Sequence, residues 1–259
     1  MIKVFFLGND KRTNYLKEMY EKENIVSEDI NDCNFVFVSI PFTKDGVHVG
    51  TEDTLIDDVI SKCKNKTIIT GGIKDNIRKK LEDNNIKYLD IMDLDETAIL
   101  NAIPTAEGAI YKAMEYRDKT IHGSNVLVLG FGRVGKVLSD KLKGLNANVF
   151  CEARNKKDLA LINALGYNVV EINDLESYLG NMDIIFSTIP SMILSQDKLN
   201  LINTDAIIID LASNPGSVDY VEAEKLGIKA YLELGIPNKV APYSAAWYLK
   251  EVIDDVINK

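Results

Sequence analysis

The sequence predicts an α/β protein built from two parallel-sheet domains. Short apolar runs alternate with amphipathic stretches along most of the 259 residues, and the runs have the length of buried strands. One helical stretch near the middle separates two blocks of this alternation, and another helical stretch follows the second block. Alternating strands and helices are typical of parallel sheets whose crossover connections are helical.

The first block predicts a domain over residues 1–103, which we expect to bind the substrate. The spacing of Tyr15, Leu16 and Met19 predicts a helix within residues 10–24, and residues 51–62 repeat the pattern. The expected strands are the apolar runs at residues 2–7, 35–40, 67–70 and 88–92.

The second block predicts a domain over residues 104–242 that begins with a linking helix. Because proline is favoured in the first turn of a helix, Pro104 predicts that this helix starts at Thr105 and ends near Tyr116. The spacing of apolar residues within 243–259 predicts a C-terminal helix that returns to the first domain. The expected strands are residues 125–129, 148–151, 184–188 and 207–211.

The composition excludes several classes of protein. A net charge of −9 argues against nucleic acid or an anionic membrane as partner, because both require clustered Lys and Arg. No window approaches the ~20 apolar residues of a membrane helix. Charged residues follow Leu7 too early for a signal peptide, so we expect a cytoplasmic protein. Cys33, Cys63 and Cys151 are scattered, so we expect free, buried thiols and no metal site.

A glycine motif follows the predicted strand 125–129. Gly130 permits a tight turn, Gly132 lets a pyrophosphate approach the backbone, and Gly135 lets helix and strand pack closely. The backbone N–H groups of Arg133 and Val134 lie at the N-terminus of the following helix, where an anion is stabilised. The motif in this context predicts a Rossmann dinucleotide-binding domain, and the alternative is a glycine-rich turn without a ligand.

The end of the next strand favours NADP over NAD. An acid at this place holds the 2′-hydroxyl of NAD, whereas Arg accommodates the 2′-phosphate of NADP. Arg154, Asn155 and Lys157 occupy the turn after the strand, and a guanidinium suits a phosphate. Glu152 keeps NAD open, since it is the nearest acid, and a solvated basic turn is the third interpretation.

Loops at the carboxyl ends of the predicted strands are the expected ligand contacts, because ligands of open α/β sheets bind there. In the second domain we expect cofactor contacts from Thr188, Ile189, Pro190 and Ser213, and a substrate contact from Ser191. In the first domain the candidate substrate contacts are Ser39, Thr43 and Gly72. Each of these loops has an ordinary turn as its alternative interpretation.

The chain resembles the family of dipicolinate synthase A subunits. The motifs that carry the resemblance are Pro104-Thr-Ala-Glu-Gly108, Thr120-Ile-His-Gly-Ser124, the glycine motif, Thr188-Ile-Pro-Ser-Met-Ile-Leu194 and Asp210-Leu-Ala-Ser213. The match runs from about residue 101 to 242, and the first hundred residues match more loosely, chiefly through Gly8-Asn-Asp-Lys-Arg12. The segment Gly235-Ile-Pro-Asn-Lys-Val240 departs from the family pattern, so Lys239 is not expected to be a family catalyst.

The resemblance implies an NADP-dependent oxidoreductase of bacterial sporulation, in the mother-cell cytoplasm. Its implied reaction is the oxidation of dihydrodipicolinate, or of its hydroxylated tetrahydro precursor, to dipicolinate. It also implies a partner, namely a second, flavoprotein-like B subunit.

Aromatising a dihydropyridine dicarboxylate requires hydride loss, proton loss and a place for two carboxylates. Thr105 and Glu107, at the expected helix start, are the first candidates for substrate hydrogen bonding and proton transfer, although a Glu there also caps a helix. His122 titrates in a suitable range, with a structural hydrogen bond as its alternative. Arg12 and Ser39 are candidates for binding a substrate carboxylate.

Two other classes stay open from the sequence. One is another two-domain NADP dehydrogenase, resembling shikimate or methylenetetrahydrofolate dehydrogenase, although Lys44 and Lys74 lack a recognisable catalytic motif. The other is a non-catalytic subunit that binds NADP as a scaffold. A homo-oligomer is compatible with the sequence, which does not fix the oligomeric state.

Overall fold

The computed structural model describes residues 2–50 and 53–258, and the chain divides into two compact units. Unit 1 comprises Met1–Asn101 with Pro237–Lys259, and unit 2 comprises Ala102–Ile236. The boundary lies inside helix α4 (Asp95–Glu115), and helix α10 (Ile236–Val240) contains the second boundary. The sequence analysis placed these boundaries at 103/104 and 242/243.

Unit 1 holds a four-stranded parallel sheet in the order β1-β2-β3-β4. The strands are β1 (Val4–Leu7), β2 (Phe35–Val38), β3 (Thr67–Thr70) and β4 (Lys87–Asp90). An isolated parallel bridge joins Val4 to Val26, so the chain after the first helix lies along the outer edge of β1 before it returns to form β2. This segment therefore lies on one side of β1 and β2 lies on the other, so the strand order reverses between β1 and β2.

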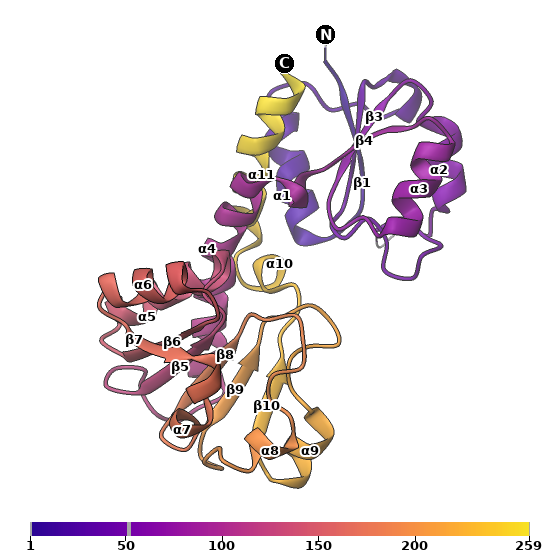
Figure 1. Ribbon diagram of the computed structural model, residues 1–259. Helices are drawn as coiled ribbons and strands as arrows, with labels where there is room; N and C mark the ends of the chain where they lie inside the picture. Colours follow the sequence, from indigo (N-terminus) through magenta and orange to yellow (C-terminus); the bar gives the residue numbers. More distant parts are fainter. Residues whose placement is uncertain (1, 51–52, 259) are drawn as a thin grey trace. The chain divides into compact units, whose positions relative to one another are not determined.

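The helices of unit 1 lie on both faces of its sheet, as that reversal requires for right-handed crossovers. Helix α1 (Lys11–Glu21) packs with α11 (Pro242–Ile257) on one face, and α2 (Ile56–Lys62) and α3 (Asp75–Asp83) cover the other (Figure 1). Tyr20 of α1 donates a hydrogen bond of 2.8 Å to Asp254 of α11. The predicted helix over 51–62 begins at Ile56, and residues 51 and 52 lie outside the described residues. Two short 3-10 helices complete the unit, Ile30–Asp32 and Ile91–Asp93.

Unit 2 holds a six-stranded parallel sheet in the order β10-β9-β8-β5-β6-β7, which is the Rossmann order. The strands are β5 (Asn125–Leu129), β6 (Asn148–Ala153), β7 (Asn168–Glu171), β8 (Ile184–Ser187), β9 (Ile207–Asp210) and β10 (Lys229–Leu232). The direction of travel reverses between β5 and β8, which pair directly. The sequence predicted β5, β6, β8 and β9, and β7 and β10 are additional.

Helices cover both faces of this sheet (Figure 1). Helices α5 (Arg133–Gly144) and α6 (Lys156–Ala164) pack on β5, β6 and β7 from one side, while α8 (Gln196–Leu199) and α9 (Tyr220–Lys225) belong to the other. A 3-10 turn (Ile172–Asp174) and α7 (Glu176–Leu179) connect β7 to β8. All residues of β8 and β9 are buried, which is the pattern of parallel strands covered on both faces.

The linking helix differs from its prediction. Helix α4 begins at Asp95, and Pro104 lies inside it rather than at its start. A proline inside a helix removes one backbone hydrogen bond and costs ~3 kcal/mol. Burial of one face compensates, since alanines at 102, 106, 109 and 113 are almost fully buried. Thr105 and Glu107 are therefore interior helical residues, and the expected helix N-terminus at this place was wrong.

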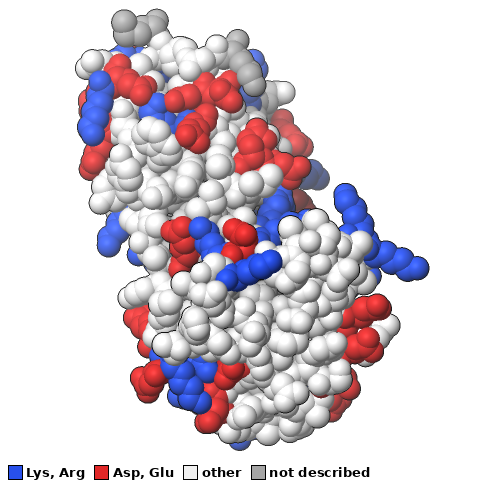
Figure 2. All heavy atoms as spheres, turned by 90° about the vertical axis from the view of Figure 1, so that its left-hand side faces the viewer, with Lys and Arg blue, Asp and Glu red and all other residues white. Residues whose placement is uncertain are grey.

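The surface carries both signs of charge. On the face drawn in Figure 2, basic and acidic side chains are interspersed around uncharged areas. No helix among the described residues combines the length and apolar character needed to span a membrane. The three cysteines are buried and free, as predicted.

Candidate functional site

The glycine turn of unit 2 has the tight turn at Gly130 and the close packing at Gly135 that its sequence predicted. Gly130 has a φ of +89°, and a Cβ on it would lie 2.7 Å from the Thr188 hydroxyl and 2.9 Å from Ile189. A Cβ on Gly135 would overlap the backbone oxygen of Gly130, so helix α5 meets the turn too closely for any side chain. Both glycines are therefore required by packing within the protein itself.

Gly132 differs from these two glycines. Apart from its chain neighbours, no atom of the described residues lies within 4 Å of the position that its Cβ would take. Helix α5 begins at the next residue with Gly132 as its N-cap. The open space beside a helix N-terminus is where a pyrophosphate is stabilised by free N–H groups. The arrangement fits a dinucleotide at the carboxyl ends of β5 and β8, where the strand order reverses.

Glu152 lies beneath this turn. The residue is 1% exposed, and one carboxyl oxygen accepts the N–H of Gly130 at 3.1 Å. The other oxygen is buried and has no hydrogen-bond partner in the described part of the chain. Burial raises the pKa of the carboxyl, although the Gly130 N–H and the charge of Arg154 act in the opposite direction.

The basic turn after β6 contains one residue that caps a helix and one that lines a pocket. Asn155 caps α6: its side-chain oxygen accepts the N–H of Asp158 at 2.8 Å and its amide donates to the Asp158 carboxylate at 2.6 Å. Arg154 is exposed and lines a pocket of about 370 Å³. Lys157 is exposed and is not among the residues that line this pocket.

The loop after β9 is held by one buried carboxylate. Asp210 accepts the N–H groups of Ala212 at 2.9 Å and Ser217 at 2.5 Å. It also accepts the hydroxyls of Ser217 at 3.0 Å and Tyr220 at 2.8 Å. These four bonds fix the loop that presents the exposed Ser213 at the carboxyl end of the sheet.

Unit 1 carries a buried cation at the carboxyl end of its own sheet. Arg12 lies in the first turn of α1 and is 7% exposed, and its guanidinium donates one hydrogen bond of 3.1 Å to the backbone oxygen of Ile40. Asp10 caps the helix by accepting the N–H groups of Arg12 and Thr13. Burial lowers the pKa of the Arg12 guanidinium, opposed by the charge of Asp10. A desolvated guanidinium at this edge suits a carboxylate ligand.

Both units thus present their characteristic groups where a ligand of an open sheet is expected, and comparison with known proteins identifies the family. Residues 2–92 match the family model for the N-terminal domain of the dipicolinate synthase A subunit, and residues 101–218 match the D-isomer specific 2-hydroxyacid dehydrogenase, NAD binding domain. The chain is 38% identical over 210 residues to the dipicolinate synthase A subunit of Bacillus subtilis, covering 80% of this chain and 70% of that protein. The chain belongs to the family of dipicolinate synthase A subunits.

Solved structures of the family agree over the whole length. The protein from Bacillus halodurans has a TM-score of 0.92 at 29% identity and covers 100% of this chain and 98% of that chain. The B. subtilis protein has a TM-score of 0.90 at 29% identity and covers 99% and 96%. This membership and the NAD-binding type of unit 2 make the chain an oxidoreductase-type subunit with a dehydrogenase role in dipicolinate synthesis that binds a pyridine nucleotide.

Within this family fold, two predicted catalytic residues have surroundings that the sequence did not indicate. Glu107 is exposed and forms an ion pair of 2.8 Å with Lys141. His122 lies in an exposed turn three residues before β5, at the amino end of the sheet, whereas the glycine turn lies at the carboxyl end. Because β5 separates the two ends, we do not retain His122 as a catalytic candidate.

The predicted substrate contacts in unit 1 are largely occupied by the protein. Ser39 is buried, its hydroxyl has no partner among the described residues, and it is enclosed by Gly8 and Gly50, at each of which a Cβ would lie within 2.7 Å of it. We therefore correct its assignment from ligand contact to packing residue. Thr43 is buried, and its hydroxyl accepts the N–H of Gly46 at 2.9 Å.

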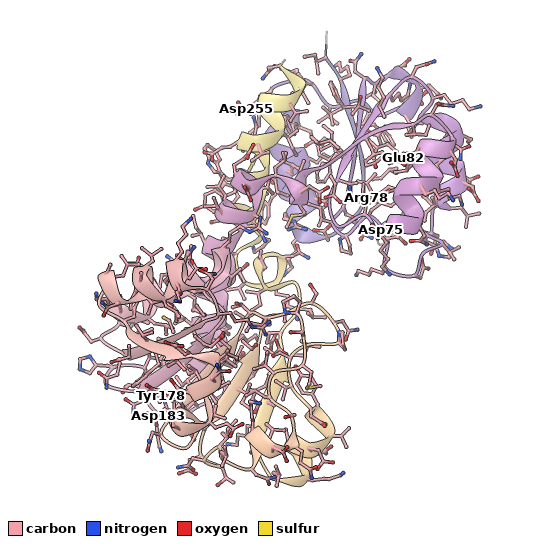
Figure 3. All side chains as sticks on the ribbon, viewed as in Figure 1. Asp75, Arg78, Glu82, Tyr178, Asp183 and Asp255 are labelled. Atoms are coloured by element: carbon pink, nitrogen blue, oxygen red, sulfur yellow. The ribbon has the colours of Figure 1, made fainter. Side chains whose placement is uncertain are left out.

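Gly72 is fixed by a buried carboxylate of the neighbouring strand. Its N–H donates to Asp90 at 3.1 Å. Arg78 of α3, which is labelled in Figure 3, pairs with the same carboxylate at 2.7 Å. The backbone donor of Gly72 is therefore already used. Sequence reasoning also missed an Asp45–His48 pair at 2.6 Å, since only the folded loop makes it visible.

Proposed function

We propose that this protein oxidises dihydrodipicolinate, or its hydroxylated tetrahydro precursor, to dipicolinate with NADP as hydride acceptor. The observation that carries the proposal is the match to the family of dipicolinate synthase A subunits over both units. Arg154 at the end of β6 supports NADP over NAD, since a planar guanidinium suits a 2′-phosphate.

The residues that would hold NADP lie along the carboxyl ends of the strands of unit 2. The N–H groups of Arg133 and Val134 and the space beside Gly132 take the pyrophosphate. Bound NADP would supply the acceptor for the hydride. Contacts to its nicotinamide half are assigned to Thr188, Ile189, Pro190 and Ser213.

The substrate carries two carboxylates, and Arg12 is assigned to one of them. Among residues 2–50 and 53–258 its buried guanidinium donates one hydrogen bond, to Ile40, and the other N–H groups can bind a carboxylate. Thr105 and Glu107, now interior residues of α4, stay proposed contacts for substrate orientation and proton transfer, and Ser191 stays a proposed substrate contact. The oxidation gains much of its driving force from aromatisation, so a single proton acceptor is sufficient.

We further assign a partner, the flavoprotein-like B subunit, and a location, the mother-cell cytoplasm of a spore-forming bacterium. Both follow from the family. They make the requirement for a second subunit part of any functional test.

The test is dipicolinate formation, followed by ultraviolet absorbance, with dihydrodipicolinate generated in situ. The chain is supplied with NADP or NAD, with and without a candidate B subunit, and Gly132→Val serves as the variant with a blocked glycine turn. Product that depends on this chain and on NADP supports the proposal. Measured NADP binding without product in any combination contradicts the proposed reaction and favours a scaffold role.

A further inference from the structure

The pocket that Arg154 lines is built by four separate segments of unit 2. Arg154 comes from the end of β6, and Ile172, Asn173 and Glu176 come from the segment after β7. Met192 and Ile193 follow β8, and Lys198 belongs to α8. Its volume of about 370 Å³ lies within the ~300–1,000 Å³ range of small-molecule sites. The segments after β6, β7 and β8 meet at the carboxyl edge of the sheet, on the same edge as the glycine turn.

The residues that line the pocket are complementary to a phosphorylated purine nucleoside. Met192 is 56% exposed, and with Ile172 and Ile193 it offers an apolar wall against which a flat base can lie. Arg154 and Lys198 contribute two cations from segments that are distant in sequence. A dianionic phosphate beside two cations forms several charge-assisted hydrogen bonds.

Lys198 forms one long ion pair within the part of the chain that the structure describes. Its ammonium lies 3.8 Å from the Glu176 carboxylate, beyond hydrogen-bond distance, and the Glu176 side chain is 62% exposed. Such solvent-accessible pairs contribute little to stability. The ammonium can therefore exchange this carboxylate for a better anion at little cost.

The expected second cation after β6 is not part of the pocket. Asn155 is used as a helix cap and Lys157 does not line the cavity. We infer that Lys198 is a specificity-determining residue that, together with Arg154, binds the 2′-phosphate of NADP. This inference rests on the proposed use of NADP, and it assigns the second cation of that site to helix α8.

The test measures binding of two fragments by isothermal titration calorimetry on the whole chain. Adenosine 2′,5′-bisphosphate carries the 2′-phosphate and 5′-AMP lacks it. We expect the wild-type protein to bind the bisphosphate more tightly than 5′-AMP. Lys198→Gln should weaken the affinity for the bisphosphate by roughly tenfold, since one charge-assisted contact is lost, and should change the affinity for 5′-AMP by less than about twofold. Arg154→Gln should remove at least as much of the preference.

Two further variants control for charge and fold. Lys225→Gln removes a lysine that pairs with a glutamate on α9, outside the pocket, and should leave both affinities unchanged. Glu176→Gln should tighten bisphosphate binding by about threefold, because it removes a competing carboxylate. Unchanged thermal unfolding of each variant shows that the fold is intact.

The outcomes separate this inference from the proposed cofactor. If Arg154→Gln loses the preference for the bisphosphate over 5′-AMP and Lys198→Gln keeps it, the assignment of Lys198 is wrong and the proposed use of NADP is retained. If Lys198→Gln weakens both fragments equally, Lys198 contacts a part that they share and the inference is overturned. If the wild-type protein shows no preference, the proposed use of NADP falls and the inference falls with it.

Discussion

In both sheets the proposed ligand-binding edge lies at the carboxyl ends of the strands, where the strand order reverses. The residues that the two edges carry are of different types. In unit 2 the edge between β5 and β8 carries glycines whose missing side chains leave room beside a helix N-terminus. In unit 1 the edge between β1 and β2 carries a buried guanidinium, Arg12. Backbone N–H groups suit a pyrophosphate of any dinucleotide, whereas a guanidinium suits a particular carboxylate. The difference between the two edges teaches that related topologies can present different residue types, which we propose serve cofactor and substrate recognition respectively.

The largest effect should distinguish the two kinds of glycine in the turn. Gly135→Val should destabilise unit 2 by several kcal/mol and abolish nucleotide binding, because its Cβ would overlap the Gly130 backbone. Gly132→Val should abolish binding while the unfolding temperature stays near that of the wild type, since its Cβ meets no atom. Thermal unfolding and NADP titration of both variants measure this.

Gly144→Ala is the matched control, because it lies in the same helix with open space at its Cβ. It should leave binding unchanged and stabilise by ~0.5–1 kcal/mol. Equal destabilisation by the substitutions at 132 and 135 would show that the turn has no room reserved for a ligand.

The next effect tests the charged edge of unit 1. Arg12→Gln should lower kcat/KM by roughly 10–100-fold, because a hydrogen bond to a charged group contributes ~1.5–3 kcal/mol. Nucleotide affinity, which belongs to unit 2, should not change. Steady-state kinetics and NADP titration of this variant are compared with the exposed neighbour variant Lys11→Gln. Loss of nucleotide affinity in Arg12→Gln would place Arg12 outside substrate recognition.

A smaller effect concerns the carboxyl beneath the glycine turn. The folded-state pKa of Glu152 is raised by burial, so the folded protein favours the protonated form. Its contribution to stability is present below the unfolded pKa of about 4.3 and is lost as the pH rises through the folded pKa. Glu152→Gln removes this loss, so the stability of the variant relative to the wild type should increase as the pH rises from about 4.3. Parallel unfolding temperatures from pH 4 to 8 would contradict it.

The smallest effect on stability should come from Glu107→Gln. The ion pair with Lys141 is exposed, and such pairs contribute ~0–1 kcal/mol. Chemical denaturation measures this change, and turnover in the same variant tests the proposed proton transfer. Reduced turnover with unchanged NADP affinity supports the proposal, whereas normal turnover leaves Glu107 as a surface ion-pair residue.

Local rules predicted the parts of the site that are encoded locally. The spacing of Gly130 and Gly135 was sufficient to predict the tight turn and the close helix packing, because strand, turn and helix are contiguous in sequence. The contact of Gly130 with Thr188 involves a distant segment and was not predicted. Pro104 misled the same kind of reasoning, since the buried alanine face of α4 outweighs the local cost of a proline. The direction of β5 alone places His122 at the amino end of the sheet, away from the glycine turn. The sequence was therefore sufficient to argue against a catalytic role for His122.

Other features depend on contacts between distant segments and could not be predicted. Asn155 suits a phosphate and a helix cap equally, and only the folded turn shows that it caps α6. The pocket that contains Lys198 requires four segments to meet. The enclosure of Ser39 by Gly8 and Gly50 likewise depends on a loop that returns to its starting strand.

Unit 1 is formed by two segments on either side of unit 2 in the sequence, which has a consequence for synthesis of the chain. One face of its sheet is completed by Ala246, Leu249 and Ile253 of α11, which are made only after the whole of unit 2. Unit 2 is contiguous, so it can fold as soon as residues 102–236 have left the ribosome. Unit 1, although it begins the chain, therefore cannot complete its core before unit 2 has been synthesised. Until then Leu16 and Tyr20 of α1 lack the partner helix against which they pack in the folded protein.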